Sequence, residues 1–354
     1  HGKRGLRILL REIDSQLLPS GLHYERSPMY HRLVLERILD AIAVTASSAV
    51  RTHLGTYARS MMLHFCRTEE EPPALNDTIP HLAPGAEALR AYAASVGVPV
   101  PDSGVDRDYA PGTPTVTAPA LIPARRGPFR VLFDADAIGP DHVPGHAHAD
   151  SLQLVVWYEG NELLVDTGTS TYDEGVRRGY ERGTAAHNTV EYDRTDSSEV
   201  WASFRVGRRA RVRLAPPVHS ADAITLEAEH DGYAHRGIVH NRCVTVSERS
   251  LVVRDVMVST RTPVAKPGLV PGHRDDGSTR ARAYWHLAPH YPHTAELVSE
   301  TTVAVGPIRF SFWGAVDLAL QTSWIATGFE KRVKTVTIVV DFQSELETII
   351  EPRY

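Results

Sequence analysis

The hydrophobic spacing changes once along these 354 residues, and this change limits the chain to folds that join a helical part to a β part. Up to about residue 105, apolar residues recur three and four positions apart, which is the spacing of one buried helix face. The second helix should begin at Ser27-Pro28, because serine caps a helix and proline fits its first turn. Four apolar sets predict the helices: Leu6, Leu9, Leu10, Ile13 and Leu17; Leu35, Ile38, Leu39 and Ile42; Leu54, Tyr57, Met61 and Phe65; and Ala86, Leu89, Tyr92 and Ala93.

After a stretch rich in proline, glycine, serine and threonine, short β-branched or alternating runs predict strands. These runs lie at 129–133, 152–158, 162–165, 223–227, 244–246, 251–253, 302–305 and 335–340. Many short strands separated by turn residues are typical of antiparallel sheets stacked as a sandwich. We therefore predict an α+β multidomain chain, with a helical domain at 1–105, a linker at 106–128 and an antiparallel β-sandwich at 129–354.

The composition argues against two classes of protein. The formal net charge of -5 is unlike that of a nucleic-acid binder, and no apolar run reaches the ~18 residues of a membrane span. Two interpretations stay open for an arginine-rich segment: a solvated set, or a cleft for an acidic substrate, since guanidinium binds carboxylate or sulfate through paired hydrogen bonds. Its members are Arg177, Arg178, Arg182, Arg205, Arg208, Arg209, Arg211 and Arg213.

Three histidines and a carboxylate stand at the ends of apolar runs within residues 145–188. In an extended strand, His146 and His148 would share one face. A His-x-His pair with a distant aspartate and a third histidine is typical of zinc sites on β-structure. We therefore expect His148, Asp166 and His187 to bind one zinc ion per chain. The alternative is that each histidine is hydrogen-bonded separately.

A second polar cluster, residues 21–31, lies where a loop should enter the second helix. It contains His23, Glu25, Tyr30 and His31. Tyrosine can act as an acid or a base where a neighbouring cation or metal lowers its pKa. The alternative is an exposed helix cap with aromatic packing.

These stretches resemble the heparinase II/III-like polysaccharide lyases. Residues 21–31 are similar to a helix start of that family, and residues 145–150, 166–172 and 182–190 are similar to three of its later motifs. Further agreement comes from Asn76-Asp77, residues 201–210 and residues 230–233. The ordered set covers most of the chain and is far more specific than any single motif.

The resemblance implies an α/α toroid followed by an antiparallel β-sandwich, so that 1–105 would be the C-terminal part of a toroid. Family members cleave acidic polysaccharides at uronic acid residues by β-elimination. The enzyme neutralises the carboxylate, removes the C5 proton and protonates the departing glycosidic oxygen. The resemblance places the acid/base at Tyr30, a cleft histidine at His146 and the zinc ligands at His148, Asp166 and His187. Substrate-binding residues would be His23, Glu25, His31, Tyr172, Tyr180 and Arg182.

The sequence also departs from the family pattern. Ser20 and Leu22 replace the usual aspartate and glycine. The family's helix that neutralises the carboxylate would lie before His1, and residues 1–105 are too few to close a toroid. We therefore expect an N-terminally incomplete chain, with an acidic polysaccharide, a missing N-terminal segment or a second copy of the chain as partners.

The predicted function is a zinc-containing polysaccharide lyase acting on a uronate polymer such as alginate, a heparan-type glycosaminoglycan or a bacterial exopolysaccharide. A catalytically silent carbohydrate-binding or structural module is the alternative. The missing upstream helix favours that module, whereas Tyr30 and His146 oppose it. Zinc-dependent hydrolysis is a third hypothesis. Substrates of this kind favour a periplasmic or secreted location.

Overall fold

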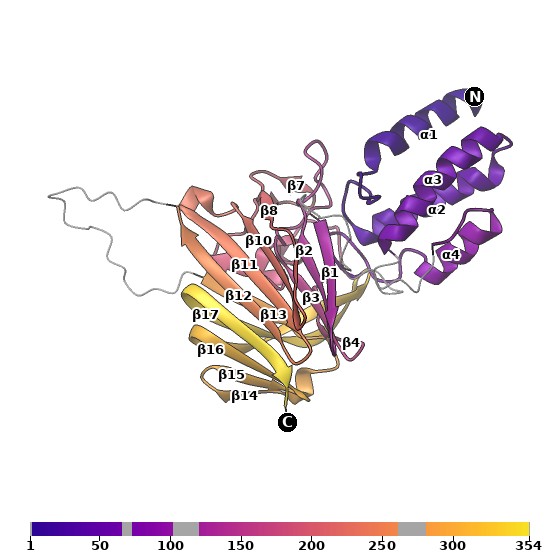
Figure 1. The fold of residues 1–354 in the computed structure, drawn as a ribbon. Coiled ribbons are helices and arrows are strands. Elements are labelled where there is room, and N and C mark those ends of the chain that lie inside the picture. The colour runs from indigo at the N-terminus through magenta and orange to yellow at the C-terminus, as the bar shows by residue number, and fades with distance from the viewer. Residues whose placement is uncertain (1, 66–72, 102–119, 261–280, 354) are drawn as a thin grey trace.

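A helical lobe lies beside a larger β lobe in the computed structural model (Figure 1). Among the residues that the structure describes, no helix is both long and apolar enough to cross a membrane. The described residues are 2–65, 73–101, 120–260 and 281–353.

Four helices form the helical lobe within the described ranges. Ser27 caps the second helix and Pro28 lies in its first turn, as predicted. Most of the predicted apolar residues pack together, with Leu39 of one helix and Leu54 and Met61 of the next in a single core cluster. The expected α/α toroid stays a prediction. The helices are α1 (Gly2–Gln16), α2 (Pro28–Val44), α3 (Ser48–Phe65) and α4 (Ala86–Ser95).

The β lobe contains a small antiparallel sheet with the strand order β1-β2-β3-β4. Its first strand corrects the predicted linker, because residues 120–126 pair along their whole length with β2. The alternating apolar residues of this strand pack into the sandwich, so the linker prediction of 106–128 extends too far. Its first part, up to residue 119, lies outside the described residues. The strands are β1 (Ala120–Arg126), β2 (Phe129–Ala135), β3 (Leu154–Tyr158) and β4 (Asn161–Leu164).

A second antiparallel sheet contains eleven strands within the described part of the chain. Its main path is β14-β15-β16-β17-β12-β11-β10-β8, while β13 pairs with β17 and β5, and β9 pairs with β10. The strands are β5 (Val190–Tyr192), β8 (Val212–Leu214), β9 (Val218–His219), β10 (Ala223–His230), β11 (Ile238–Ser247), β12 (Leu251–Ser259), β13 (Ala281–His286), β14 (Ala295–Ser299), β15 (Thr302–Val305), β16 (Ile308–Gly328) and β17 (Lys331–Pro352).

The two sheets share one hydrophobic core, as expected for a sandwich. Phe133 and Val156 of the small sheet lie in the same buried cluster as Trp285, Phe310 and Phe342 of the large sheet. Burial of each large apolar side chain stabilises the fold by roughly 1.5–3 kcal/mol. Strand-like spacing in the sequence therefore predicted the correct architecture for this lobe.

The tip of one long hairpin and several short elements lie next to the loops between the two sheets. The long hairpin β16–β17 is hydrogen-bonded near its tip to the loop at 166–172: the Ala326 amide donates to the Thr167 carbonyl at 2.8 Å and the Glu330 amide to the Ser170 carbonyl at 2.7 Å. The hairpin thus supports that loop. The remaining short elements are β6 (Val200–Trp201), β7 (Arg205–Val206), α5 (Val176–Arg182), η1 (Thr184–Ala186), η2 (Ala234–Arg236) and η3 (Pro292–Thr294).

Candidate active site

The expected site residues come from loops and from the helices α2 and α5 near the junction of the two lobes. The segment 145–150 is an irregular loop rather than the extended strand we predicted. Backbone hydrogen bonds join it to its neighbours: the Asp77 amide donates to the His146 carbonyl at 3.3 Å, and the Ala149 amide to the Arg182 carbonyl at 2.8 Å. Because both sides of the loop are tied in this way, its two histidines have defined directions.

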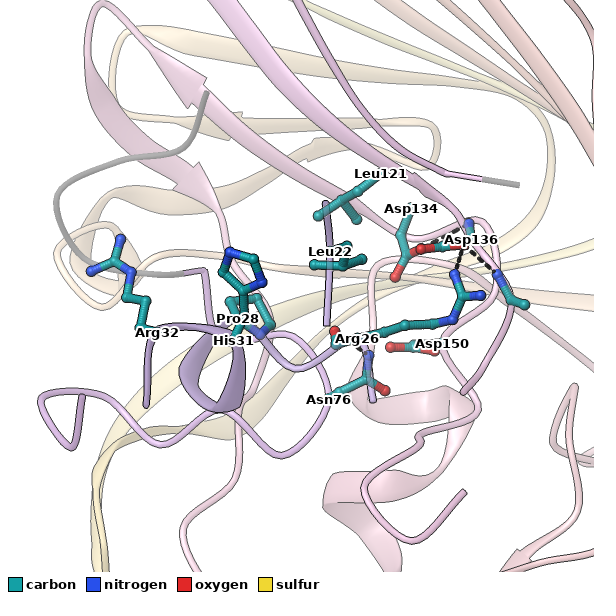
Figure 2. A pocket seen from close by; sticks show the side chains of 11 residues that line it. Leu22, Arg26, Pro28, His31, Arg32, Asn76, Leu121, Asp134, Asp136 and Asp150 are labelled. Carbon is teal, nitrogen blue, oxygen red and sulfur yellow. Dashed lines mark hydrogen bonds and ion pairs between the residues drawn. The ribbon is translucent and has the colours of Figure 1, made fainter. Parts of the chain in front are cut away.

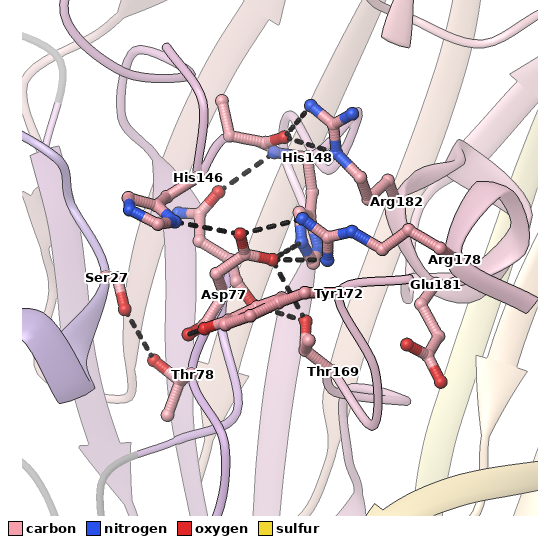
Figure 3. A network of polar contacts seen from close by, with 12 residues as sticks. Ser27, Asp77, Thr78, His146, His148, Thr169, Tyr172, Arg178, Glu181 and Arg182 are labelled. Atoms are coloured by element: carbon pink, nitrogen blue, oxygen red, sulfur yellow. Dashed lines mark hydrogen bonds and ion pairs between the residues drawn. The ribbon is translucent and has the colours of Figure 1, made fainter. Parts of the chain in front are cut away.

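Asp77 is the centre of the polar network at this junction (Figure 3). Its side chain is fully buried. Nδ1 of His146 lies 2.9 Å from Oδ2, Nε2 of His148 lies 2.9 Å from Oδ1, and Nη2 of Arg178 donates to Oδ2 at 2.7 Å. Burial opposes ionisation, but the hydrogen bonds from His146 and His148 and the Arg178 guanidinium hold the pKa of Asp77 well below its usual range. Asp77 is therefore a buried carboxylate that fixes both histidines.

Tyr30, His146 and Tyr172 meet at the accessible edge of this network. The ring centroids of Tyr30 and His146 are 4.2 Å apart, and the Tyr30 and Tyr172 hydroxyl oxygens are 3.1 Å apart. A Glu25 carboxylate oxygen lies 4.0 Å from Nε2 of His146. His146 keeps about a fifth of its side chain exposed (22%), so its outer nitrogen can meet a ligand.

The pKa values of Tyr30 and Tyr172 are raised, whereas we expected a lowered tyrosine pKa. Burial raises the pKa of Tyr30 above its ordinary value, although the hydrogen bond from Tyr172 and the Arg178 charge act in the opposite direction. Burial likewise raises the pKa of Tyr172. The neighbouring Arg178 cation thus acts in the predicted direction, but burial outweighs it and the net shift of the Tyr30 pKa is upward. Both hydroxyls hold their protons near neutral pH and can donate them.

The predicted metal ligands lie together but are not all arranged as ligands. His148 and His187 are buried, with their ring centroids 5.4 Å apart. Nδ1 of His148 and Nε2 of His187 are buried nitrogens without a hydrogen-bond partner. Asp166 instead binds the other nitrogen of His187, at 2.7 Å from Nδ1. No group of three or more His, Cys, Asp or Glu side chains in the described ranges is arranged to hold a metal ion.

The donor set nevertheless suits zinc in two respects. Two imidazole nitrogens are left without partners inside the protein, where an unpaired polar atom is costly. The opposite nitrogens, on His148 and His187, are each bound to a carboxylate, which is the arrangement that orients metal-ligating histidines. The two histidines therefore fit a metal ion, whereas the Asp166 oxygens contact Nδ1 of His187 and the Gly168 amide.

Arg182 does not line a groove, which corrects its predicted role in substrate binding. Its guanidinium is buried and donates to four backbone carbonyls, among them Ala147 at 3.0 Å and Trp201 at 3.2 Å. Arg178 is buried in the same way against Asp77. Arg178 and Arg182 thus hold loops together. They are neither solvated nor part of a cleft for an acidic substrate, which were the two interpretations of the arginine-rich segment.

The N-terminal cluster divides into buried and site-facing residues. His31 is buried, with Nδ1 accepting from the His23 amide at 3.1 Å and Nε2 donating to the Met61 carbonyl at 3.1 Å. His23 is also buried, and burial lowers its pKa to about 4. Substrate contact is therefore not supported for His23 and His31, because their rings lie inside the lobe. Glu25, by contrast, faces His146.

A small pocket beside the site contains buried carboxylates at the contact of the lobes (Figure 2). Arg26 of the helical lobe forms an ion pair with Asp136, which follows β2. Burial, and then repulsion from Asp150, raises the pKa of Asp134 well above its usual range. Asn76 donates from its side chain to the Arg26 carbonyl at 3.2 Å. The Arg26–Asp136 ion pair therefore joins the helical lobe to the sandwich.

Sequence reasoning missed two functional positions, Asp77 and Arg178. Asp77 is on an irregular segment of the helical lobe, and its partners are 69, 71 and 101 residues away along the chain. The available signal was the Asn76-Asp77 match to the family, which we noted without assigning it a role. Arg178 was only one of eight arginines in its segment.

The geometry defines a two-lobed protein, with a helical lobe and an antiparallel sandwich that share one polar site. The chain belongs to the heparinase II/III-like family. Two family models match it: heparinase II/III-like, C-terminal, over residues 120–351, and heparinase II/III N-terminus, over residues 2–78. The predicted resemblance is confirmed.

Solved structures share this fold at low sequence identity. A heparinase III matches with a TM-score of 0.73 and 14% identity, covering 98% of this chain and 57% of that one. The heparan sulfate lyase HepC from Pedobacter heparinus matches with a TM-score of 0.69 and 14% identity, covering 98% and 55%. A heparinase III gene product matches with a TM-score of 0.69 and 16% identity, covering 99% and 55%. This chain therefore spans little more than half the length of those structures, and no curated protein sequence matches it.

Proposed function

We propose that the chain carries the Tyr–His part of the active site of a polysaccharide lyase, which cleaves a uronate-containing polysaccharide by β-elimination. The observation that carries this proposal is the meeting of Tyr30, His146 and Tyr172 at one partly exposed point, with His146 oriented by the buried Asp77. Family membership supports a lyase of this class.

The hydrogen-bond pattern suggests a role for each group. The Asp77 carboxylate favours a proton on Nδ1 of His146, so Nε2 carries a lone pair. That nitrogen would accept the C5 proton of the uronate, the C4–C5 double bond would form, and the C4–O bond would break. The Tyr30 hydroxyl, which keeps its proton because burial raises its pKa, would donate that proton to the departing oxygen. Tyr172 would hold the Tyr30 hydroxyl in place.

The remaining requirement is neutralisation of the substrate carboxylate. We propose that its donor comes from a segment outside this sequence, and that α1–α4 are the last helices of an α/α toroid. The solved structures with this fold are nearly twice the length of the chain, which supports both statements.

We further propose one zinc ion held by His148 and His187, with Asp166 as the third ligand. Zinc would supply cross-linking of the loops that carry His146 and Tyr172, rather than a reactive water. The two unpartnered ring nitrogens support this proposal. His148 shares the Asp77 carboxylate with His146, so fixing one ring would also fix the other.

The names of structurally similar proteins favour a glycosaminoglycan of the heparan type as substrate, ahead of alginate. Incubation with heparan sulfate, heparin, alginate and polygalacturonate, followed by ultraviolet absorbance and product mass, tests the proposal. β-Elimination yields an unsaturated end and adds no water, whereas hydrolysis adds one water per cleavage. Binding without any product on every acidic polymer, with the upstream segment restored, would instead support the catalytically silent module.

A further inference from the structure

A second hollow lies in the β lobe, separate from the Tyr30 site. It has a volume of about 370 Å³. Its walls come from α5, β13, β16 and β17. The residues that line it include Tyr180, Tyr284, Gln321, Ser323, Trp324 and Arg332.

Buried polar groups form the floor of this hollow. The Thr337 hydroxyl lies 2.7 Å from Nδ1 of His286 and 2.7 Å from the Ser323 hydroxyl, and Nε2 of His286 donates to the Ala185 carbonyl at 3.1 Å. Strand register places Gln321 directly opposite Thr337. A hollow with hydroxyl and amide groups at its base can hydrogen-bond a polyhydroxylated ligand.

The rim is aromatic and basic. Trp324 is 45% exposed and Tyr180 is 39% exposed, so both aromatic rings are open to a ligand in the hollow. The Arg332 guanidinium stacks over the Trp324 ring, 5.4 Å from its centroid. Lys331 and Lys334, both exposed, flank Arg332 on the same hairpin. Glu181 also lines the hollow; it is buried, and its carboxylate accepts from the Ser170 amide at 3.0 Å, whereas the basic side chains at the rim are exposed.

Two elements that line the hollow also contact the candidate active site. Arg178 and Tyr180 are two residues apart on α5, with Arg178 bound to Asp77 and Tyr180 lining the hollow. The hairpin that carries Trp324 and Arg332 is also hydrogen-bonded to the loop that bears Tyr172. α5 and the β16–β17 hairpin therefore connect the hollow to the candidate active site.

We propose that this hollow binds a second acidic sugar residue of the polysaccharide, with the sugar ring against Trp324 and its carboxylate or sulfate on Arg332. Aromatic faces bind the apolar faces of sugar rings, and guanidinium binds carboxylate or sulfate through paired hydrogen bonds. The inference rests on the proposed polysaccharide substrate, but it does not require turnover.

Calorimetric titration of a heparan sulfate hexasaccharide into the Tyr30→Phe protein tests the inference without cleavage. Trp324→Ala and Arg332→Gln should each weaken binding at least tenfold, and neutral cellohexaose should bind at least tenfold more weakly than the acidic probe. Trp313→Ala is the matched control, because Trp313 is exposed on β16 outside the hollow. That variant should bind within twofold of its parent.

Two results overturn the inference: no saturable binding of the hexasaccharide, or affinities of the Trp324→Ala and Arg332→Gln proteins within twofold of the parent. Turnover of the polymer, measured with Tyr30 intact, separates this test from that of the lyase. Trp324-dependent binding without product, in a protein that also contains the proposed carboxylate-neutralising segment, would refute the lyase assignment alone. Product formation with an unchanged KM in the Trp324→Ala and Arg332→Gln proteins would refute the second binding site alone.

Discussion

Replacing Asp77 with asparagine removes the charge at the centre of the site while keeping the shape of the side chain. Asp77 and Arg178 are both fully buried, and the guanidinium binds both carboxylate oxygens. Solvent therefore screens neither partner, and the substitution leaves a buried cation without its counter-ion. Breaking such a pair costs about 3–5 kcal/mol.

This cost should be visible as a large loss of stability. For a domain of this size, each kcal/mol corresponds to roughly 2–4 °C, so the Asp77→Asn protein should melt about 6–20 °C below the parent. Urea unfolding, followed by tryptophan fluorescence, gives the free energy directly.

Asp193→Asn is the matched control, since Asp193 forms an ion pair of 2.9 Å with Arg236 in which both side chains are nearly half exposed. Exposed pairs contribute about 0–1 kcal/mol, so this variant should stay close to the parent. A loss below about 1 kcal/mol in the Asp77→Asn protein would refute the assignment of Asp77 as the buried centre of the network.

Three further predictions follow from other parts of the structure. His148→Ala should lower zinc content and thermal stability together, measured by elemental analysis and calorimetry, and a metal-free parent with an unaffected variant would contradict the zinc proposal. Ser27→Ala should cost about 1 kcal/mol in urea unfolding, because Ser27 caps α2; no loss would show that the cap contributes nothing. The pKa of Asp255 is about 2, because the Arg242 charge and the His240 hydrogen bond outweigh burial. Its stabilisation should be complete above the unfolded pKa of ~3.9 and be lost as pH falls toward 2, so Asp255→Asn should flatten the stability profile there.

The architecture of the β lobe was predictable because period-two alternation reports directly which face of a strand is buried. The start of α2 was predictable for a similar local reason, since Ser27 and Pro28 act on the helix that they begin. The predicted linker wrongly included residues 120–126. This segment contains a proline and two arginines, and a composition of that kind is typical of loops. Pairing with β2 outweighs that local preference.

The site was predictable only in part, because its centre depends on contacts between distant segments. Spacing predicted that His146 and His148 share one strand face, whereas the structure places them in a loop, at opposite oxygens of Asp77. The burial of Arg182 could not be read from its segment, since its partners are backbone carbonyls from several loops. Charge patterns in a sequence do not distinguish a solvated arginine from one that ties loops together.

The most direct test of the central claim is the rate at which Tyr30→Phe protein forms unsaturated product from heparan sulfate, compared with the parent. Both proteins should contain the proposed carboxylate-neutralising segment. The phenyl ring retains the packing against His146, and only the proton donor is lost. Loss of general acid catalysis predicts a rate reduced by about 10²–10⁴-fold with unchanged thermal stability. An unchanged rate would contradict the role of Tyr30 and with it the proposed site.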